Sequence, residues 1–332
     1  MWWRSVLWAG AMFGSFAAII INALWVVGYL GGRIFGCRLP YAPFGWTALG
    51  LVLIIWGGLA WGYFIGRFRV ETTEVEYHSD EVPAAFDGYR VVHISDLHVD
   101  SFNSKPQALQ KIVDRVNALD ADIILFTGDV TSGPYDDIPK HESALKAFKA
   151  REGVVSVMGN HDFFIYDPAF TTDAERSEAA DRLTRYERET LGWTVLRNSS
   201  MMLRRGQDSI AVAGVDNING NQGFATIQKG DLAKAMNGLE GVFTVLMSHD
   251  PSHWTAEVLP KSHAQITLSG HTHAAQARFF GWSVANLAFK ECDGRYDTPD
   301  GRMLYVNAGI GCTAPFRIGC PSEITVITLK RN

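Results

Sequence analysis

The stretch Tyr89-Arg-Val-Val-His-Ile-Ser-Asp-Leu-His98 decides the fold of this chain. Its first half is mostly apolar and rich in β-branched residues, which is typical of a buried strand. Its second half is polar, with Asp96 and His98 directly after the apolar run and two positions apart. Residues at i and i+2 share one face of an extended backbone, so both side chains can reach the same ligand. The stretch therefore predicts a buried strand that ends at a functional site.

The same change from apolar to polar recurs at four later places. In chain order these polar clusters are Gly128-Asp129, Gly159-Asn-His-Asp162, His249 and Gly270-His-Thr-His273, after the apolar runs 122–127, 154–157, 242–247 and 266–268. The carboxyl ends of strands in an α/β sheet converge on one crevice. We therefore expect the five clusters to meet in space although they are far apart in the sequence.

The residue types in these clusters predict a site for divalent metal ions. Carboxylates, one amide oxygen and imidazoles suit Mn, Fe or Zn, and no cysteine lies in the clusters to make a thiolate site. Two ions held about 3.5–4 Å apart need a bridging anion, and Asp129, a lone carboxylate after a glycine, is the natural candidate. Gly128, Gly159 and Gly270 permit sharp turns and a close approach of backbone to the ions.

Helical patterns alternate with the strands, which predicts an α/β sheet covered by helices. The expected helices are Pro106–Leu119, Pro139–Lys149 and Asp173–Thr190. Further strands are expected at 210–215, 303–306 and 324–329. The polar, acid-rich residues 71–88 are expected to form a linker between an N-terminal part, 1–70, and the domain 89–332.

The N-terminal part is apolar enough to be a membrane anchor. Residues 5–32 and 44–66 carry no charge, and each stretch exceeds the roughly 20 residues that cross a bilayer. We expect a transmembrane helical hairpin, multi-pass in the cell membrane; the alternative for the first stretch is a cleaved signal peptide. A hairpin places the domain on the side of Arg4, Arg67 and Arg69. Arginines at 33 and 38 lie on the other side, so the charge rule favours the cytoplasm by one residue.

The rest of the chain is acidic. Five of the 30 basic residues and none of the 35 acidic residues lie in the first 70 positions, so the remainder has a net charge of −10. This balance argues against nucleic acid as a partner, because binding to the phosphate backbone needs clustered cations. Four cysteines show no CxxC pair, and a disulfide between Cys312 and Cys320 stays open.

The order of the five clusters resembles that of the calcineurin-like metallophosphoesterases, over roughly residues 89–329. The surrounding sequence resembles the membrane-anchored bacterial branch of that family. The stretches that carry this likeness are Ile94-Ser-Asp-Leu-His98, Ser248-His-Asp-Pro-Ser-His-Trp254, Leu268-Ser-Gly-His-Thr-His273 and Tyr305-Val-Asn-Ala-Gly-Ile-Gly311. One departure is Ala274-Ala275, where the branch often has two glycines, and it removes no ligand.

The resemblance implies a four-layer α/β/β/α sandwich that holds two divalent metal ions. The first ion would be held by Asp96, His98 and His273, the second by Asn160, His249 and His271, with Asp129 bridging them. His161 would face the substrate as the acid that protonates the leaving group, with Asp162 orienting its ring. Arg317 is a candidate contact for a substrate phosphate, since a guanidinium suits that group.

The expected function is that of a membrane-anchored, metal-dependent phosphoesterase. Its substrate class is a phosphomonoester, phosphodiester or pyrophosphate, all of which use the same metal core, and the membrane anchor makes a lipid-linked substrate the working hypothesis. The alternative is a catalytically silent binding or scaffold protein of the same fold at the membrane. A metallo-β-lactamase type of site is excluded, because Ala274 and Ala275 follow His273 where that site needs an aspartate. The oligomeric state stays open.

Overall fold

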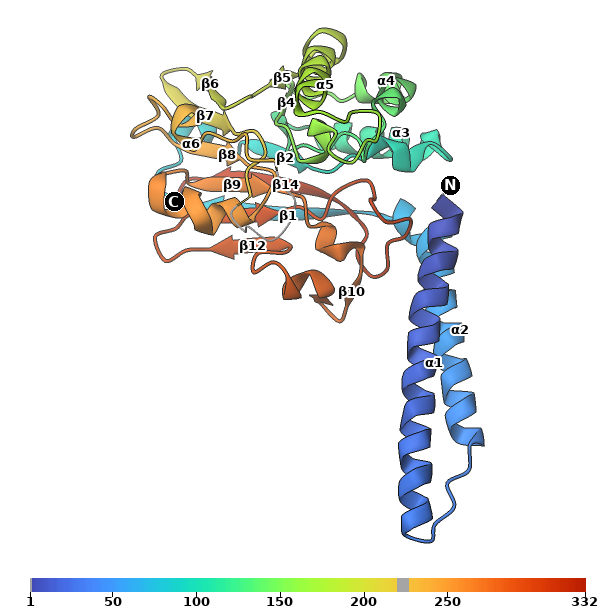
Figure 1. Cartoon of the computed structure of the whole chain (residues 1–332). Coiled ribbons are helices and arrows are strands. Elements are labelled where there is room, and N and C mark those ends of the chain that lie inside the picture. Colours follow the sequence, from blue (N-terminus) through green and yellow to red (C-terminus); the bar gives the residue numbers. More distant parts are fainter. Residues whose placement is uncertain (1, 220–226) are drawn as a thin grey trace. The chain divides into compact units, whose positions relative to one another are not determined.

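The computed structural model describes residues 2–219 and 227–332, which form two compact units (Figure 1). The first unit contains the chain as far as Phe68 together with Ala314–Gly319. The second contains Arg69–Thr313 and Cys320–Asn332. Each unit is described by itself.

The first unit is built on two long apolar helices. Helix α1 spans Trp2–Ile34 and α2 spans Ala42–Phe64, followed by the 3-10 turn η1, Gly66–Phe68. Each contains an 18-residue window with a mean hydropathy of 1.9, and both are long enough to cross a membrane. The polar Asn22 of α1 is satisfied within the pair, because its Nδ2 donates to Ala18 O and its Oδ1 accepts from the Tyr41 hydroxyl. Length and composition thus mark this unit as a membrane-associated segment.

Two six-stranded sheets form the second unit. In the first sheet the strand order is β1-β14-β2-β3-β4-β5. Its strands span Val70–His78 (β1), Arg90–Ile94 (β2), Ile123–Phe126 (β3), Val154–Ser156 (β4), Thr194–Val195 (β5) and Ser322–Lys330 (β14). Strands β2 to β5 are parallel, so their carboxyl ends lie at one edge of the sheet.

The second sheet has the order β12-β13-β9-β8-β7-β6. Its strands span Ser199–Arg205 (β6), Asp208–Gly214 (β7), Thr244–Met247 (β8), Ile266–Ser269 (β9), Gly294–Asp297 (β12) and Met303–Val306 (β13). The four inner strands are parallel, and the two outer strands are antiparallel to them. A separate short hairpin pairs β10, Arg278–Phe279, with β11, Trp282–Ser283.

The main hydrophobic core lies between the two sheets. Residues of the first sheet such as Val91 and Leu125 share it with residues of the second such as Val245 and Leu268. Alternate residues face the other way, as the two-residue period of a strand requires. On the outer face of the second sheet, Leu246 packs in a cluster with Trp254 and other helical side chains.

Helices cover the outer faces of both sheets. Figure 1 shows α3, α4 and α5 grouped on the side of β4 and β5, and Leu232 and Ala235 of α6 pack in the cluster on the outer face of the second sheet. The α-helices of this unit span Pro106–Asn117 (α3), Glu142–Leu145 (α4), Asp173–Arg185 (α5), Leu232–Ala235 (α6) and Leu259–Lys261 (α7). The shorter 3-10 and π turns span Ala84–Phe86 (η2), Val99–Phe102 (η3), Tyr135–His141 (η4), His161–Phe163 (η5), Tyr186–Leu191 (η6), Trp254–Val258 (η7), His273–Gln276 (η8) and Val284–Leu287 (η9). The four-layer α/β/β/α sandwich expected from the sequence is confirmed.

Two expected helices differ from those observed. The segment 139–149 was expected to be one helix but consists of η4, which contains Pro139, and the four-residue α4. Proline is tolerated in the first turn of an α-helix but not in its interior, and here the turn begins four residues earlier, at Tyr135, so Pro139 lies inside a 3-10 segment. The helix expected at 173–190 is α5 followed by the π turn η6.

The expected linker 71–88 contains a strand and belongs to the second unit, which begins at Arg69, so it is not a separate connecting segment. Strand β1 occupies Val70–His78 and pairs in parallel with β14 along its whole length. Because β1 is an edge strand with one neighbour, most of its residues are partly or fully exposed, and its acid-rich composition is that of a linker. Its one buried side chain, Tyr77, contacts Phe243 with ring centroids 5.9 Å apart and donates its hydroxyl to Gly301 O.

If β1 belongs to the sandwich, replacing its buried residue must destabilise the domain. We expect Tyr77→Ala to lower the free energy of unfolding by about 3–5 kcal/mol, the usual cost of removing a large buried ring. The matched control is Glu74→Ala on the same strand, whose side chain is exposed and whose loss we expect to change stability by less than about 0.5 kcal/mol. Urea denaturation of both full-length variants in detergent measures the difference, and equal midpoints would show that β1 adds nothing.

Candidate metal centre

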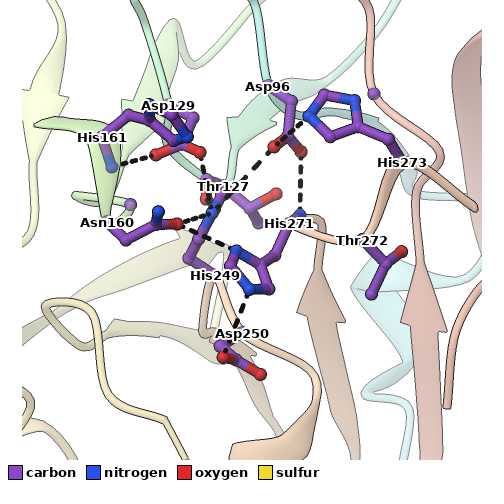
Figure 2. A network of polar contacts seen from close by, with 12 residues as sticks. Asp96, Thr127, Asp129, Asn160, His161, His249, Asp250, His271, Thr272 and His273 are labelled. Carbon is purple, nitrogen blue, oxygen red and sulfur yellow. Dashed lines mark hydrogen bonds and ion pairs between the residues drawn. The ribbon is translucent and has the colours of Figure 1, made fainter. Parts of the chain in front are cut away.

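The polar clusters that follow five of the strands converge on one region (Figure 2). Asp96 and Asp129 follow β2 and β3 of the first sheet, and Asn160 follows β4. His249 follows β8 and His271 follows β9 of the second sheet. Because these strands are parallel within each sheet, their carboxyl ends meet at a common edge of the sandwich.

One group of possible ligands consists of Asp96, His98 and His273, whose ligand atoms all lie within 4.8 Å of one another. His273 Nε2 is 3.3 Å from Asp96 Oδ1. His98 Nε2 is 3.1 Å from His273 Nε2. All three residues are buried.

A second group consists of Asp129, His249 and His271, again within 4.8 Å. His249 Nε2 is 3.1 Å from Asp129 Oδ2. The amide oxygen of Asn160 lies 3.1 Å from His249 Nε2 and 2.9 Å from His271 Nδ1, so it belongs to the same group.

Asp129 connects the two groups. Its Oδ2 lies 3.1 Å from His249 Nε2 in the second group and 3.8 Å from His98 Nε2 in the first. Its Oδ1 accepts from the backbone N–H of His161 at 2.9 Å. The His161 ring is itself close enough to form a third possible ligand group with His98 and Asp129. The seven residues expected to bind metal, and His161, are therefore brought together.

The donor set fits divalent cations. Asp96 Oδ1 is buried and accepts no hydrogen bond, which is costly for a charged oxygen unless a cation satisfies it. Imidazole nitrogens from two histidines point at one another across 3.1 Å beside it. Oxygen and imidazole ligands without thiolates suit Mn, Fe or Zn, as expected from the sequence.

Electrostatics keep the two buried carboxylates ionised. Burial by itself would raise the pKa of Asp96 and of Asp129, but the attraction of His273 and His249 holds both pKa values below the usual range. Burial likewise opposes a charge on His249, yet Asp129 overrides it and raises the pKa of His249 to about 10. In the absence of metal, the raised pKa of His249 favours a proton at a position that a cation would take instead.

Five of the seven expected ligand residues have a left-handed backbone. The φ angles are +52° for Asp96, +36° for His98, +64° for Asp129, +71° for His271 and +51° for His273. Residues with a Cβ rarely adopt this region, and such strain clusters at functional sites where the surrounding structure enforces it. Each strand reverses sharply at its end here and presents the side chain to the common edge.

Asp162 has a different role from the one expected. We expected it to orient the His161 ring, but its carboxylate accepts the backbone N–H groups of Asp129, Val130 and Gly159 at 2.7–2.8 Å. The His161 ring is held instead by Ser132 O, which accepts from Nδ1 at 2.7 Å. Asp162 therefore fixes the turn that carries Asp129. The expected contact between Asp162 and the His161 ring was wrong. The Asp162 carboxylate accepts three backbone hydrogen bonds instead, whereas the imidazole would have donated only one.

Other hydrogen bonds orient the histidines. His249 Nδ1 donates to Thr127 O at 2.7 Å, which leaves its Nε2 free to face Asp129. His98 Nδ1 lies 3.1 Å from Ser132 Oγ. Asp250 Oδ2, buried and without a hydrogen bond, lies 3.6 Å from His271 Nε2. Sequence reasoning missed this role of Asp250, although a carboxylate directly after His249 was the available signal.

Two further expectations concern Arg317 and the pair Cys312 and Cys320. Arg317 lies in the segment Ala314–Gly319, which belongs to the first unit, so its contact with a substrate phosphate stays a prediction. The structure has no disulfide between Cys312 and Cys320, and both thiols are buried. Cys320 Sγ donates to His273 O at 3.5 Å, a contact that a disulfide would remove.

A two-sheet α/β sandwich with carboxylates and imidazoles gathered at its strand ends defines a metal-dependent hydrolase. The comparison with known families gives the same answer. Residues 89–275, more than half of the chain, match the family described as calcineurin-like phosphoesterase, and the chain belongs to this family. It is thus a metal-dependent phosphoric ester hydrolase.

Individual relatives match most of the chain. An uncharacterised metallophosphoesterase of Bacillus subtilis, YkuE, is 30% identical over 86% of this chain and 94% of its own length. A zebrafish (Danio rerio) protein named as a transmembrane protein with metallophosphoesterase domain is 30% identical over 85% of this chain, which spans 62% of that relative. A Chlamydia trachomatis protein, named UDP-2,3-diacylglucosamine pyrophosphatase LpxG, is 26% identical over 85% of this chain and 94% of its own length.

The glycine before His271 offers a test of how tightly the centre is packed. A Cβ at Gly270 would lie 1.8 Å from Ser95 Oγ and 2.2 Å from Asp96 Oδ2, so Gly270→Ala must displace the Asp96 carboxylate. We expect the bound metal to fall by about one ion per chain, measured by elemental analysis of the purified protein. The control is Gly133→Ala, where the nearest atom would be 3.9 Å away. Unchanged metal content in Gly270→Ala would contradict this coupling between position 270 and the ligands of the first ion.

Proposed function

We propose that this chain is a membrane-anchored phosphoesterase with a dinuclear metal centre, and that it hydrolyses a phosphoester or pyrophosphate bond in a lipid-linked substrate. The observation that carries the proposal is the pair of ligand groups connected by Asp129, in a chain that also has two membrane-length helices. The likeness to a relative named as a UDP-2,3-diacylglucosamine pyrophosphatase supports the lipid-linked pyrophosphate as the substrate class.

Seven residues would hold the metal ions. Asp96, His98 and His273 would hold one ion. Asn160, His249 and His271 would hold the other, with Asp129 shared between them. When bound, two such cations polarise the phosphoryl group and make water more acidic, which favours attack on phosphorus. The positions of Thr127 O, Ser132 Oγ and Asp250 then fix the imidazoles in the orientation that binding requires.

His161 is the proposed acid for the leaving group. Its Nδ1 is engaged by Ser132 O, so its Nε2 is the nitrogen left to meet a substrate. The side chain is partly exposed, in contrast to the buried His98 and His249. A donor at this position can protonate the departing alkoxide or phosphate and stabilise charge as it develops.

The anchor is proposed to be a helical hairpin that crosses the membrane twice. The helices α1 and α2 are each long enough, and the seven residues between them, 35–41, are too few to form a domain of their own. Both ends of such a hairpin lie on one side, and the excess of one arginine there favours the cytoplasm.

Metal analysis and a substrate panel test the proposed function. Full-length protein in detergent should bind two ions per chain and, with Mn²⁺, cleave a diacylated sugar nucleotide faster than p-nitrophenyl phosphate or bis(p-nitrophenyl) phosphate. Cleavage of the soluble esters alone would remove the lipid-linked substrate. Two bound ions without hydrolysis of any ester would favour the scaffold alternative.

Replacing His161 separates a proton donor from a metal ligand. We expect His161→Ala to lower kcat by roughly 10²–10⁴-fold, the usual size of a general-acid contribution, while both ions stay bound. The control is His78→Ala, an exposed histidine of β1. Loss of an ion from the variant would instead make His161 a ligand, and a near wild-type rate would remove its role.

Replacing Asp129 tests the bridge. Because this carboxylate contacts histidines of both groups, Asp129→Ala should weaken both sites and abolish hydrolysis of every ester in the panel. Isothermal titration of the metal-free protein with Mn²⁺ measures the two affinities. An unchanged affinity at either site would rule out bridging.

A further inference from the structure

The second unit exposes a run of large apolar side chains between His273 and Cys292. Phe279, Phe280 and Trp282 lie on or at the turn of the β10–β11 hairpin, and Val284 and Leu287 lie on η9. Phe280 is fully exposed and Leu287 is 81% exposed. Elsewhere in the described part of this unit, only Tyr166 and Met202 are exposed large apolar side chains. We call residues 279–287 the apolar segment.

The apolar segment is attached to the loop that carries two of the proposed ligands. At one end Ser283 Oγ donates to Ala274 O, next to His273. Beyond its other end, Cys292 O accepts from Thr272 Oγ1, between His271 and His273. The ring of Phe289 also contacts that of His271, with centroids 5.7 Å apart. Whatever the segment binds is therefore held beside the metal centre.

The composition of the segment favours a bilayer as its partner. A contiguous exposed apolar patch on an otherwise polar domain marks an interaction site. Aromatic and aliphatic side chains next to a basic residue are typical of groups that lie at the boundary between headgroups and acyl chains. The basic residues here are Arg278, which pairs with Asp293, and Lys290, whose side chain is 85% exposed and lies 3.9 Å from Glu291 Oε1.

The connection between the domain and the membrane-length helix α2 is short. Helix α2 ends at Phe64 and β1 begins at Val70, so five residues separate a membrane-length helix from the domain. A tether this short keeps the domain at the membrane surface, since five extended residues span less than about 18 Å. Among the described residues we find no comparable feature that would favour a soluble protein as the partner of the apolar segment.

We propose that the apolar segment inserts into the membrane interface and forms a second contact with the bilayer, separate from the two helices. Inserted there, it holds the loop of His271 and His273 at headgroup level, where the phosphate of a membrane lipid can reach the metal centre while its acyl chains stay in the bilayer. The inference rests on the proposed membrane anchoring, and its consequence for catalysis rests on the proposed lipid-linked substrate.

Fluorescence quenching by lipid tests the insertion. Full-length protein with Cys37→Ser, which removes the exposed thiol, would carry Phe280→Cys labelled with an environment-sensitive fluorophore. The matched control is Gln207→Cys in the exposed turn between β6 and β7, and the Cys37→Ser parent corrects for labelling of buried thiols. In nanodiscs of phosphatidylcholine and phosphatidylglycerol with nitroxide-labelled chains, we expect the label at 280 to be quenched at least threefold more than that at 207.

Each other outcome overturns the inference in a distinguishable way. Equal quenching at the two positions, with the protein retained in membranes after alkaline carbonate extraction, contradicts insertion alone. Release by carbonate contradicts the anchoring as well. Protection of the label that rises with protein concentration, without quenching by lipid, would assign the segment to a second copy of the chain.

A kinetic comparison tests the consequence. The variant Phe279→Ser/Phe280→Ser/Leu287→Ser should lose at least tenfold in hydrolysis of a diacylated sugar nucleotide in vesicles, with hydrolysis of soluble bis(p-nitrophenyl) phosphate unchanged. Met202→Ser is the control for loss of an exposed apolar side chain elsewhere. Equal loss on both substrates would make the segment merely structural, and no loss on either would show that it does not present lipid. Failure of the wild type on the lipid substrate alone would instead contradict the proposed function.

Discussion

The structure of the second unit depends on two carboxylates, Asp96 and Asp129, that are ionised although almost no water reaches them. An isolated buried carboxylate would take up a proton, because the loss of hydration costs several kcal/mol. Here imidazoles from the second sheet supply the compensating charge, so the two sheets must meet with their carboxyl ends aligned. The same arrangement suits divalent cations, which would supply positive charge beside the two carboxylates.

The carboxylates and imidazoles of the site are brought together by a backbone conformation that most residues avoid. Asp96, Asp129 and His273 each adopt a left-handed conformation directly after a strand or in the loop that follows one, which costs of order 1 kcal/mol or more apiece. The cost is offset by bonds such as those that Asp162 accepts from three backbone N–H groups. Glycines at the narrowest points leave no room for a side chain, as the contact of position 270 with Ser95 shows. Hydrogen bonding and close packing around the site thus hold these residues in their strained backbone conformation.

Two features of the chain relate the candidate metal centre to a membrane. Two apolar helices of membrane-spanning length precede the domain, and the second ends five residues before the first strand, so the proposed anchor would keep the hydrolase at a membrane surface. A soluble phosphoesterase gains nothing from exposing Phe280 and Leu287 to water. In a tethered one, the proposed insertion of the same side chains would bring the loop of His271 and His273 to the headgroups, because hydrogen bonds join the segment to that loop. Anchor, apolar segment and metal loop are therefore consistent with one substrate class at the bilayer.

Local sequence was sufficient for most of the fold and for the composition of the site. Apolar runs followed by Asp96, Asp129 or His249 predict the ends of strands. The buried strand and the polar residue after it are adjacent in the sequence, so both can be recognised locally. It was not sufficient where partners are distant. The acid-rich β1 has the composition of a linker, and only its pairing with β14 makes it a strand. Asp162 is a hydrogen-bond acceptor in any sequence, but which donors it meets depends on how the β3 and β4 loops pack. The sequence alone thus determined which chemistry the chain carries, whereas the tertiary structure decided which groups satisfy one another, because charge compensation and hydrogen bonding act across space rather than along the chain.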